Sequence, residues 1–153
     1  MNAPGPGEVL FGFVRYWSRR ARSGDRSVAE QGRLVLATES VAGLLSRGER
    51  ASVNAVADEI GVDQSVASRL MRNAADAGYV TMTKAPSDGR GREATVTPKG
   101  RTVIRQAHEW QERVFDELTV GWSQQRRDDF QAALAELIER SRAIDTRVTH
   151  MTR

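Results

Sequence analysis

A glycine between two short amphipathic segments is the feature that most constrains how this chain can fold. The first segment follows Ser52, a residue type that caps helix N-termini, and its apolar residues recur at the spacing of one helix face: Val53, Val56, Ala57 and Ile60. Gly61 can adopt the left-handed conformation that ends a helix, and the Asp63 side chain can accept the first amide hydrogen bonds of the next one. The spacing therefore predicts two helices joined by a tight turn, a helix-turn-helix.

The second segment, residues 64–77, has two chemically opposite faces. Its apolar residues share one face: Ala67, Leu70, Met71 and Ala74. The other face carries small hydroxylated side chains and cationic ones, namely Ser65, Ser68, Arg69 and Arg72, with Gln64 at its start and Val66 at its edge. Arginine can make a bidentate contact to guanine, serine can reach phosphates or base edges, and valine can touch a thymine methyl group. These six residues are candidate DNA contacts, although any one arginine taken alone also fits an ordinary solvated surface.

Two antiparallel β-strands are expected after this helix. Residues 79–84 (YVTMTK) are rich in β-branched and aromatic side chains, and residues 93–97 (EATVT) alternate polar and apolar. The loop between them, APSDGRGR, has arginines near its tip that suit a narrow, electronegative minor groove, and Asp88 can orient the Arg90 guanidinium. The candidate DNA contacts of this hairpin are Lys84, Asp88, Arg90 and Arg92. A charged loop that does not touch nucleic acid is the alternative.

The order of these motifs resembles the MarR family of bacterial transcriptional regulators. The resemblance is carried by LMRNAADAGYV (70–80), then Asp88-x-Arg90, then VTPKG (96–100). It implies a winged helix-turn-helix whose second helix reads the major groove through Ser65, Ser68, Arg69 and Arg72, and whose wing places Arg90 in the minor groove. The chain departs from the family pattern at Gly89, where paired arginines are common, and at Val96, where leucine is usual.

Helical patterns flank this module on both sides. Residues 8–22 predict an N-terminal helix with an aromatic face, and residues 27–46 predict a second helix, or two if Thr38-Glu39-Ser40 restarts it. Thr97 and Pro98 start a long helix that Gly121 interrupts, and Ser123 caps a last one. The expected domains are a flexible leader (1–7), N-terminal helices (8–47), a winged helix-turn-helix (48–97) and C-terminal dimerisation helices (98–150). The fold class is mainly α with a small β-hairpin wing.

The apolar residues of the last helix recur at the alternating spacing of a helix that packs along another helix: Phe130, Leu134, Leu137, Ser141, Ile144 and Val148. Most aromatic residues also lie in the end helices. We therefore expect a two-fold homodimer with two recognition helices in major grooves about 34 Å apart, on a pseudo-palindromic DNA site.

Composition excludes several kinds of chemistry. The chain has no cysteine, which excludes disulfides, thiolate catalysis and thiolate metal sites. Its two histidines, His108 and His150, have no companion at metal-ligand spacing, and no glycine loop of the nucleotide-binding types is present. We expect no metal, no cofactor and no enzymatic activity.

Charge and hydropathy indicate the cellular location that we expect for the protein and the kind of partner that it binds. No apolar run approaches the about 20 residues that span a bilayer, and the N-terminus lacks the pattern of a signal peptide, so we expect a cytoplasmic protein without a membrane partner. The net charge is +3, but residues 64–101 hold seven Lys or Arg against three Asp or Glu. This local excess of positive charge is typical of a surface that binds phosphates.

These features favour a sequence-specific DNA-binding regulator of transcription, expected to be a repressor. The resemblance implies that a small aromatic or other hydrophobic molecule binds between the dimer helices and the winged module, changes the separation of the two DNA-reading helices and releases the DNA. Tyr16, Trp17 and Trp110 are the candidate ligand contacts, although each also fits plain packing. Two alternatives stay open: an architectural DNA-binding protein that needs no ligand, and a winged fold that contacts only other proteins.

Overall fold

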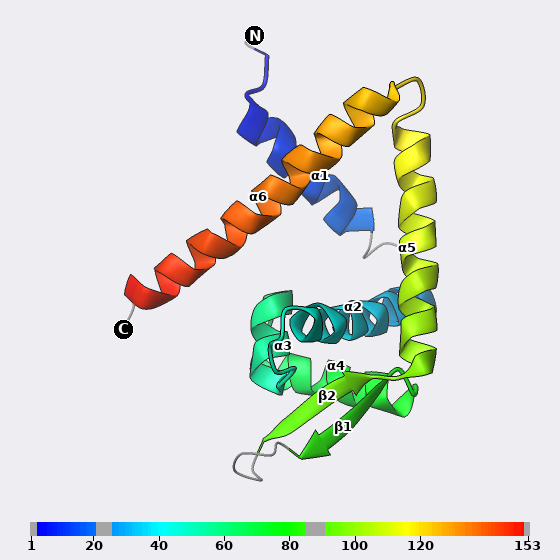
Figure 1. Cartoon of the computed structure of the whole chain (residues 1–153), viewed down its shortest axis with the longest axis vertical. Coiled ribbons are helices and arrows are strands. Elements are labelled where there is room, and N and C mark those ends of the chain that lie inside the picture. The colour runs from blue at the N-terminus through cyan, green and yellow to red at the C-terminus, as the bar shows by residue number, and fades with distance from the viewer. Residues whose placement is uncertain (1–2, 21–25, 85–90, 152–153) are drawn as a thin grey trace. The chain divides into compact units, whose positions relative to one another are not determined.

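The computed structural model describes residues 3–20, 26–84 and 91–151, and these ranges form six helices and one two-stranded antiparallel sheet (Figure 1). The elements follow one another as α1 (Pro6–Arg20), α2 (Arg26–Ser46), α3 (Val53–Ile60), α4 (Gln64–Asp76), β1 (Val80–Lys84), β2 (Arg92–Val96), α5 (Pro98–Leu118) and α6 (Gln124–Met151). The predicted fold class, mainly α with a small β-hairpin, is confirmed. The chain divides into two compact units, Met1–His108 and Glu109–Arg153. The predicted domain boundaries stay predictions.

The helix-turn-helix forms largely through local backbone chemistry. The Ala55 amide donates to Ser52 Oγ at 3.2 Å, which caps α3 as predicted. Gly61 ends α3 with a φ of 75°, and its amide donates to the Ala57 carbonyl at 2.9 Å. These two caps fix the start of α3 and the turn into α4.

The predicted cap of α4 is only half right. Asp63 has the extended backbone of an N-cap residue, and its carbonyl accepts the first helical hydrogen bond from Ala67 at 3.0 Å. Its side chain, however, makes no capping hydrogen bond. Asp63 is exposed, so water can satisfy the first amides of α4 in place of the carboxylate.

The core of the first unit lies where α2, α3, α4 and the hairpin meet. The four residues predicted to face inward from α4, namely Ala67, Leu70, Met71 and Ala74, are all buried. They belong to a buried set that includes Val41 and Leu44 from α2, Val56 from α3, Val80 from β1 and Ala94 from β2. Because this set occupies the inward face of α4, the opposite face of that helix is left to solvent.

The segment 26–46 is one helix, which settles the question left open by Thr38-Glu39-Ser40. Thr38 Oγ1 donates to the Leu34 carbonyl at 2.7 Å, and Ser40 Oγ donates to the Leu36 carbonyl at 2.8 Å. Both residues are buried. Their hydroxyls are thus satisfied one turn back along the same helix, so no restart is needed.

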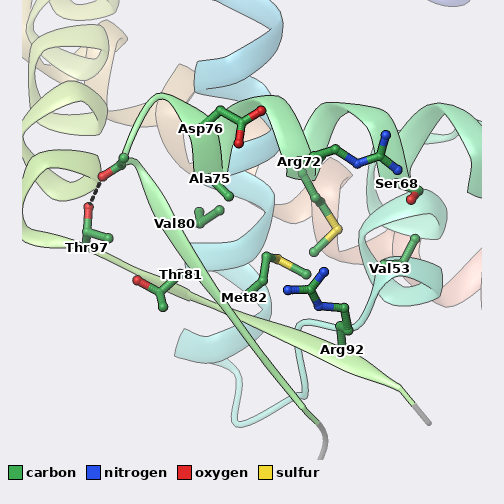
Figure 2. Close-up of a pocket in the computed structure, with 12 residues that line it drawn as sticks. Val53, Ser68, Arg72, Ala75, Asp76, Val80, Thr81, Met82, Arg92 and Thr97 are labelled. Atoms are coloured by element: carbon green, nitrogen blue, oxygen red, sulfur yellow. Dashed lines mark hydrogen bonds between the residues drawn. The ribbon is translucent and has the colours of Figure 1, made fainter.

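The hairpin is attached to its surroundings at its base and along β2. Its register pairs Val80 with Val96 at one end and Lys84 with Arg92 at the other. At the base, Thr97 Oγ1 donates to the Gly78 carbonyl at 2.6 Å and accepts the Gly100 amide at 3.0 Å, which caps α5 (Figure 2). On the other side, the Ala94 amide donates to the Ala51 carbonyl at 2.9 Å. The hairpin is therefore fixed relative to α3 and α4.

The α5–α6 turn of the second unit is held by aromatic contacts. Phe130 stacks on Phe115 with ring centroids 6.1 Å apart, and Trp122 meets Phe130 edge-on at 5.5 Å. As predicted, Ser123 Oγ accepts the Arg126 amide at 3.2 Å at the start of α6. The turn itself uses Gly121 with a φ of 83°.

Large apolar side chains remain exposed on the terminal helices. On α1, which starts at Pro6 because proline suits the first turn of a helix, they are Val9, Leu10, Phe11, Phe13, Val14 and Tyr16. On α6 they are Phe130, Leu134, Leu137, Ile138 and Ile144. None of the helices in the described ranges has the length and apolar character that a membrane span requires.

Candidate nucleic-acid interface

The outward face of α4 carries the residues that the sequence predicted there. Gln64, Ser65, Arg69 and Arg72 are exposed, and Val66 and Ser68 are half-buried. The inward apolar stripe of α4 explains this placement, since residues 65, 68, 69 and 72 share the opposite side of a helix. The side chains of this face are small near the N-terminus of α4 and cationic further along. The base edges of a DNA duplex can therefore come close to the helix backbone at one end and contact guanidinium groups at the other.

Four cations on α4 and the hairpin form no ion pair with an acidic side chain among the described residues. They are Arg69 and Arg72 of α4, Lys84 of β1 and Arg92 of β2. Arg47, in contrast, is held by Glu49 at 2.6 Å and by Glu59 at 2.7 Å, and the hydrogen bonds to these two carboxylates raise the pKa of its guanidinium. A phosphate can therefore reach the cations on α4 and the hairpin without first displacing any carboxylate of the described residues.

The open end of the hairpin places two of these cations side by side. Lys84 and Arg92 are direct cross-strand partners, and both are exposed. Like charges directly opposite each other destabilise an antiparallel pair. Their juxtaposition costs stability in the free protein and favours an anion nearby.

A pocket of about 490 Å³ lies between α4 and the hairpin. Figure 2 shows Met82 of β1 lying between α4 and Arg92, with Ser68 and Arg72 on α4 and Val53 of α3 beside them. We call it the α4–hairpin pocket. It joins the α4 face to one of the hairpin cations, because Arg72 and Arg92 both line it although they are twenty residues apart in the chain.

Sequence reasoning missed Met82 and Val53 as parts of this site. The signal for Met82 was present in the alternation of β1, where Val80 and Met82 are more buried than Thr81 and Thr83. Val53 was assigned only to the inward stripe of its helix, yet it is half-buried at the edge of the pocket. Asp88 and Arg90, the predicted minor-groove pair, lie outside the described residues.

None of the three candidate ligand contacts is among the residues that line the α4–hairpin pocket. Tyr16 and Trp17 pack edge-to-face on α1, with ring centroids 5.9 Å apart. Trp110 lies on the part of α5 that belongs to the second unit, and 53% of its surface is exposed. Their role in ligand binding stays a prediction.

No group of three His, Cys, Asp or Glu side chains in the described ranges is arranged to hold a metal ion. His108 Nε2 lies 2.9 Å from Glu39 Oε1, so this histidine joins α5 to α2.

The comparisons with known proteins agree with this geometry. A model of the MarR family matches residues 40–91, which run from the end of α2 into the segment before β2. No curated protein matches the chain significantly.

Solved structures extend the likeness to most of the chain. A crystal structure of MarR is 23% identical, with a TM-score of 0.68 over 94% of this chain and 96% of that one. A MarR transcriptional regulator from Methanosarcina mazei is 16% identical, with a TM-score of 0.66 over 90% and 99%. BpsR of Bordetella bronchiseptica is 18% identical, with a TM-score of 0.54 over 85% and 98%. At these identities the likeness shows the fold, which is the winged helix seen in these structures, and the family match covers the helix-turn-helix part of it.

Proposed function

We propose that this protein binds double-stranded DNA as a homodimer and represses transcription from a pseudo-palindromic operator. In this proposal α4 enters the major groove and the hairpin approaches the adjacent minor groove. The observation that carries it is the outward face of α4, where Arg69 and Arg72 are exposed and have no acidic partner among the described residues. A buried apolar stripe on the same helix holds that face outward.

The exposed apolar side chains of the terminal helices support the dimer. Phe11 and Phe13 on α1 are more than half exposed, and so are Ile138 and Ile144 on α6. Monomeric proteins seldom leave so many large apolar side chains open to water. A second copy of the chain would cover them, and a two-fold axis would set the two α4 helices one helical turn of DNA apart, about 34 Å.

The proposal assigns the protein a binding role in the cytoplasm and no catalytic step. Several of its carboxylates are already engaged in surface ion pairs: Asp116 with Arg127, Glu139 with Arg142, and Glu136 with Arg140. Such paired, exposed carboxylates are typical of solvated helix faces.

A selection of bound sites from random DNA tests the proposal directly. We expect a pseudo-palindrome whose half-sites are one helical turn apart, bound by one dimer. Affinity for that site should fall steeply as salt rises, because phosphate neutralisation releases counterions. No enriched site, or an affinity that does not change with salt, would favour the alternative in which the winged fold contacts only proteins.

We also propose that a small aromatic molecule releases the protein from DNA. The support is a likeness of fold to BpsR, whose DNA binding is regulated by 6-hydroxynicotinic acid, together with the aromatic side chains of Tyr16, Trp17 and Trp110. An effector acts only if it binds one conformation better than the other, and tenfold weaker DNA binding takes about 1.4 kcal/mol of coupling. Titrating the protein–operator complex with phenolic and heteroaromatic acids tests this. A complex that none of them dissociates would favour the ligand-independent architectural protein.

A further inference from the structure

Asp63, the residue in front of α4, has a carboxylate that the fold itself does not use. We propose that this carboxylate reads a base in the major groove, where it accepts a hydrogen bond from the exocyclic amino group of a cytosine. This inference rests on the proposed DNA binding and deepens it, because it names a base that the operator must carry. It also adds to the α4 face a residue that the sequence indicated only as a helix cap.

Hydrogen bonds fix the backbone of Asp63 at the start of the α4 face. Asp63 has the extended backbone of an N-cap residue, and its carbonyl accepts the Ala67 amide at 3.0 Å. The turn in front of it is fixed as well, because the Val62 amide donates to the Ala57 carbonyl at 3.0 Å. The side chain is therefore presented from a defined point, next to the exposed Gln64.

The carboxylate of Asp63 has no partner within the described residues. An N-cap aspartate usually accepts an amide hydrogen bond from the first turn of its helix. Asp63 makes no such hydrogen bond, and it forms no ion pair with a described cation. It is also exposed. Both of its oxygens can thus accept a hydrogen bond from a bound molecule.

The charges along the chain indicate which part of a DNA duplex Asp63 can face. Residues 51–68 contain three acidic residues and no Lys or Arg, and the cations Arg69 and Arg72 come only further along α4. Phosphates repel a carboxylate that has no cation beside it. The start of α4 is therefore poorly suited to the backbone of the duplex, whereas base edges in the major groove offer hydrogen-bond donors.

The hydrogen-bonding pattern of the bases then selects cytosine. An ionised carboxylate only accepts hydrogen bonds. In the major groove cytosine presents its N4 amino group, whereas guanine and thymine present acceptors. Adenine presents its amino group beside the N7 acceptor, which repels the second carboxylate oxygen. Asp63 therefore favours cytosine and rejects guanine and thymine.

A chemical change on the base tests this contact. N4-methylcytosine still pairs with guanine, but in the duplex its methyl group replaces the amino hydrogen that faces the major groove. The modified base is placed at one cytosine at a time along the selected operator. We expect wild-type affinity to fall by about 10-fold at one cytosine of each half-site, because the contact that discriminates this base is lost.

Variants of the protein assign the effect to Asp63. Asp63→Ala should bind equally well with cytosine or N4-methylcytosine at that position. Asp63→Asn keeps a residue type that caps helices, and it should admit adenine there, because an amide both donates and accepts. The matched control is Asp58→Asn, which removes the same charge from an exposed position of α3 and should keep the wild-type preference. Circular dichroism checks that each variant is folded.

The outcomes separate this contact from the proposed function. If Asp63→Ala and Asp63→Asn select the same bases as the wild type and lose as much affinity at each modified cytosine, the carboxylate does not read the operator, while the proposed function stands. The same conclusion follows if the wild type tolerates N4-methylcytosine at every position. A wild-type protein that binds no DNA would overturn both.

Discussion

The winged module and the terminal helices of this chain differ in how far they bury their apolar side chains. The module has a core of its own, in which Met71, Val41 and Val56 are almost completely buried, and the exposed residues of α4 are all polar or charged. The terminal helices leave Phe11, Phe13 and Ile144 more than half exposed. In the proposed function, the module that is complete by itself turns toward DNA, and a second copy of the chain covers the open apolar faces of the terminal helices.

The largest expected effect comes from a substitution that destabilises the winged module. Met71→Ala removes one of the largest fully buried side chains and should lower the free energy of unfolding by about 2 to 5 kcal/mol, because the vacated space cannot close completely. Denaturant unfolding measures this loss. It should be the same at every protein concentration, and a loss that shrinks as protein concentration rises would show that Met71 stabilises the dimer instead.

The second prediction concerns a substitution on the apolar side of a terminal helix. Leu137→Glu places a charge on the apolar side of α6, where 46% of Leu137 is exposed, and should convert the dimer to a monomer. Operator affinity should fall by about 100-fold or more, since the two half-sites are no longer bound together. Sedimentation and operator binding measure these changes. The control is Gln131→Glu, which adds the same charge at a polar exposed position of α6. A Leu137→Glu protein that remains a dimer would remove α6 from the interface.

The third prediction concerns the hairpin tip. Arg90→Ala should weaken operator binding by about 1 to 3 kcal/mol if its guanidinium enters the minor groove. The loss should be largest on operators whose outer base pairs are A·T, because that minor groove is narrow and strongly electronegative. Fluorescence anisotropy with paired operators measures the difference. Unchanged binding would leave Arg90 as a solvated residue of the loop.

The smallest expected effect concerns the join between α2 and the hairpin. Gln31 Nε2 donates to Tyr79 Oη at 2.7 Å, and Tyr79 is buried next to the start of β1. Tyr79→Phe removes this hydrogen bond while keeping the ring, and should cost about 1 kcal/mol of stability. Thermal unfolding measures it. A matching loss in Gln31→Leu, with no further loss in the double variant, would assign the cost to this one contact.

Local signals predicted much of the module from the sequence. Ser52, Gly61, Thr97 and Ser123 act at helix ends through neighbours within a few residues, and the spacing of Ala67, Leu70, Met71 and Ala74 depends only on the helical period. The Asp63 side chain failed as a cap because its exposed position lets water compete.

The α4–hairpin pocket could not be predicted in the same way. It depends on Arg72 and Arg92 meeting across twenty residues of intervening chain, and on the depth to which Met82 settles against α4. Neither follows from periodicity, because both arise from packing between elements. Thr38 and Ser40 are a different case, because their hydroxyls donate to carbonyls one turn back in the same helix and so need no break in it.

The central claim is that the outward face of α4 reads base pairs, and the ratio of affinities for the selected operator and an unrelated duplex tests it most directly. Arg69→Ala should reduce this ratio by about 10-fold or more, since a bidentate arginine–guanine contact contributes about 1 to 3 kcal/mol of discrimination. Binding to the unrelated duplex should change little. If Arg69→Ala weakens binding to both duplexes equally and leaves the ratio unchanged, Arg69 does not read bases and the claim for this face of α4 is contradicted.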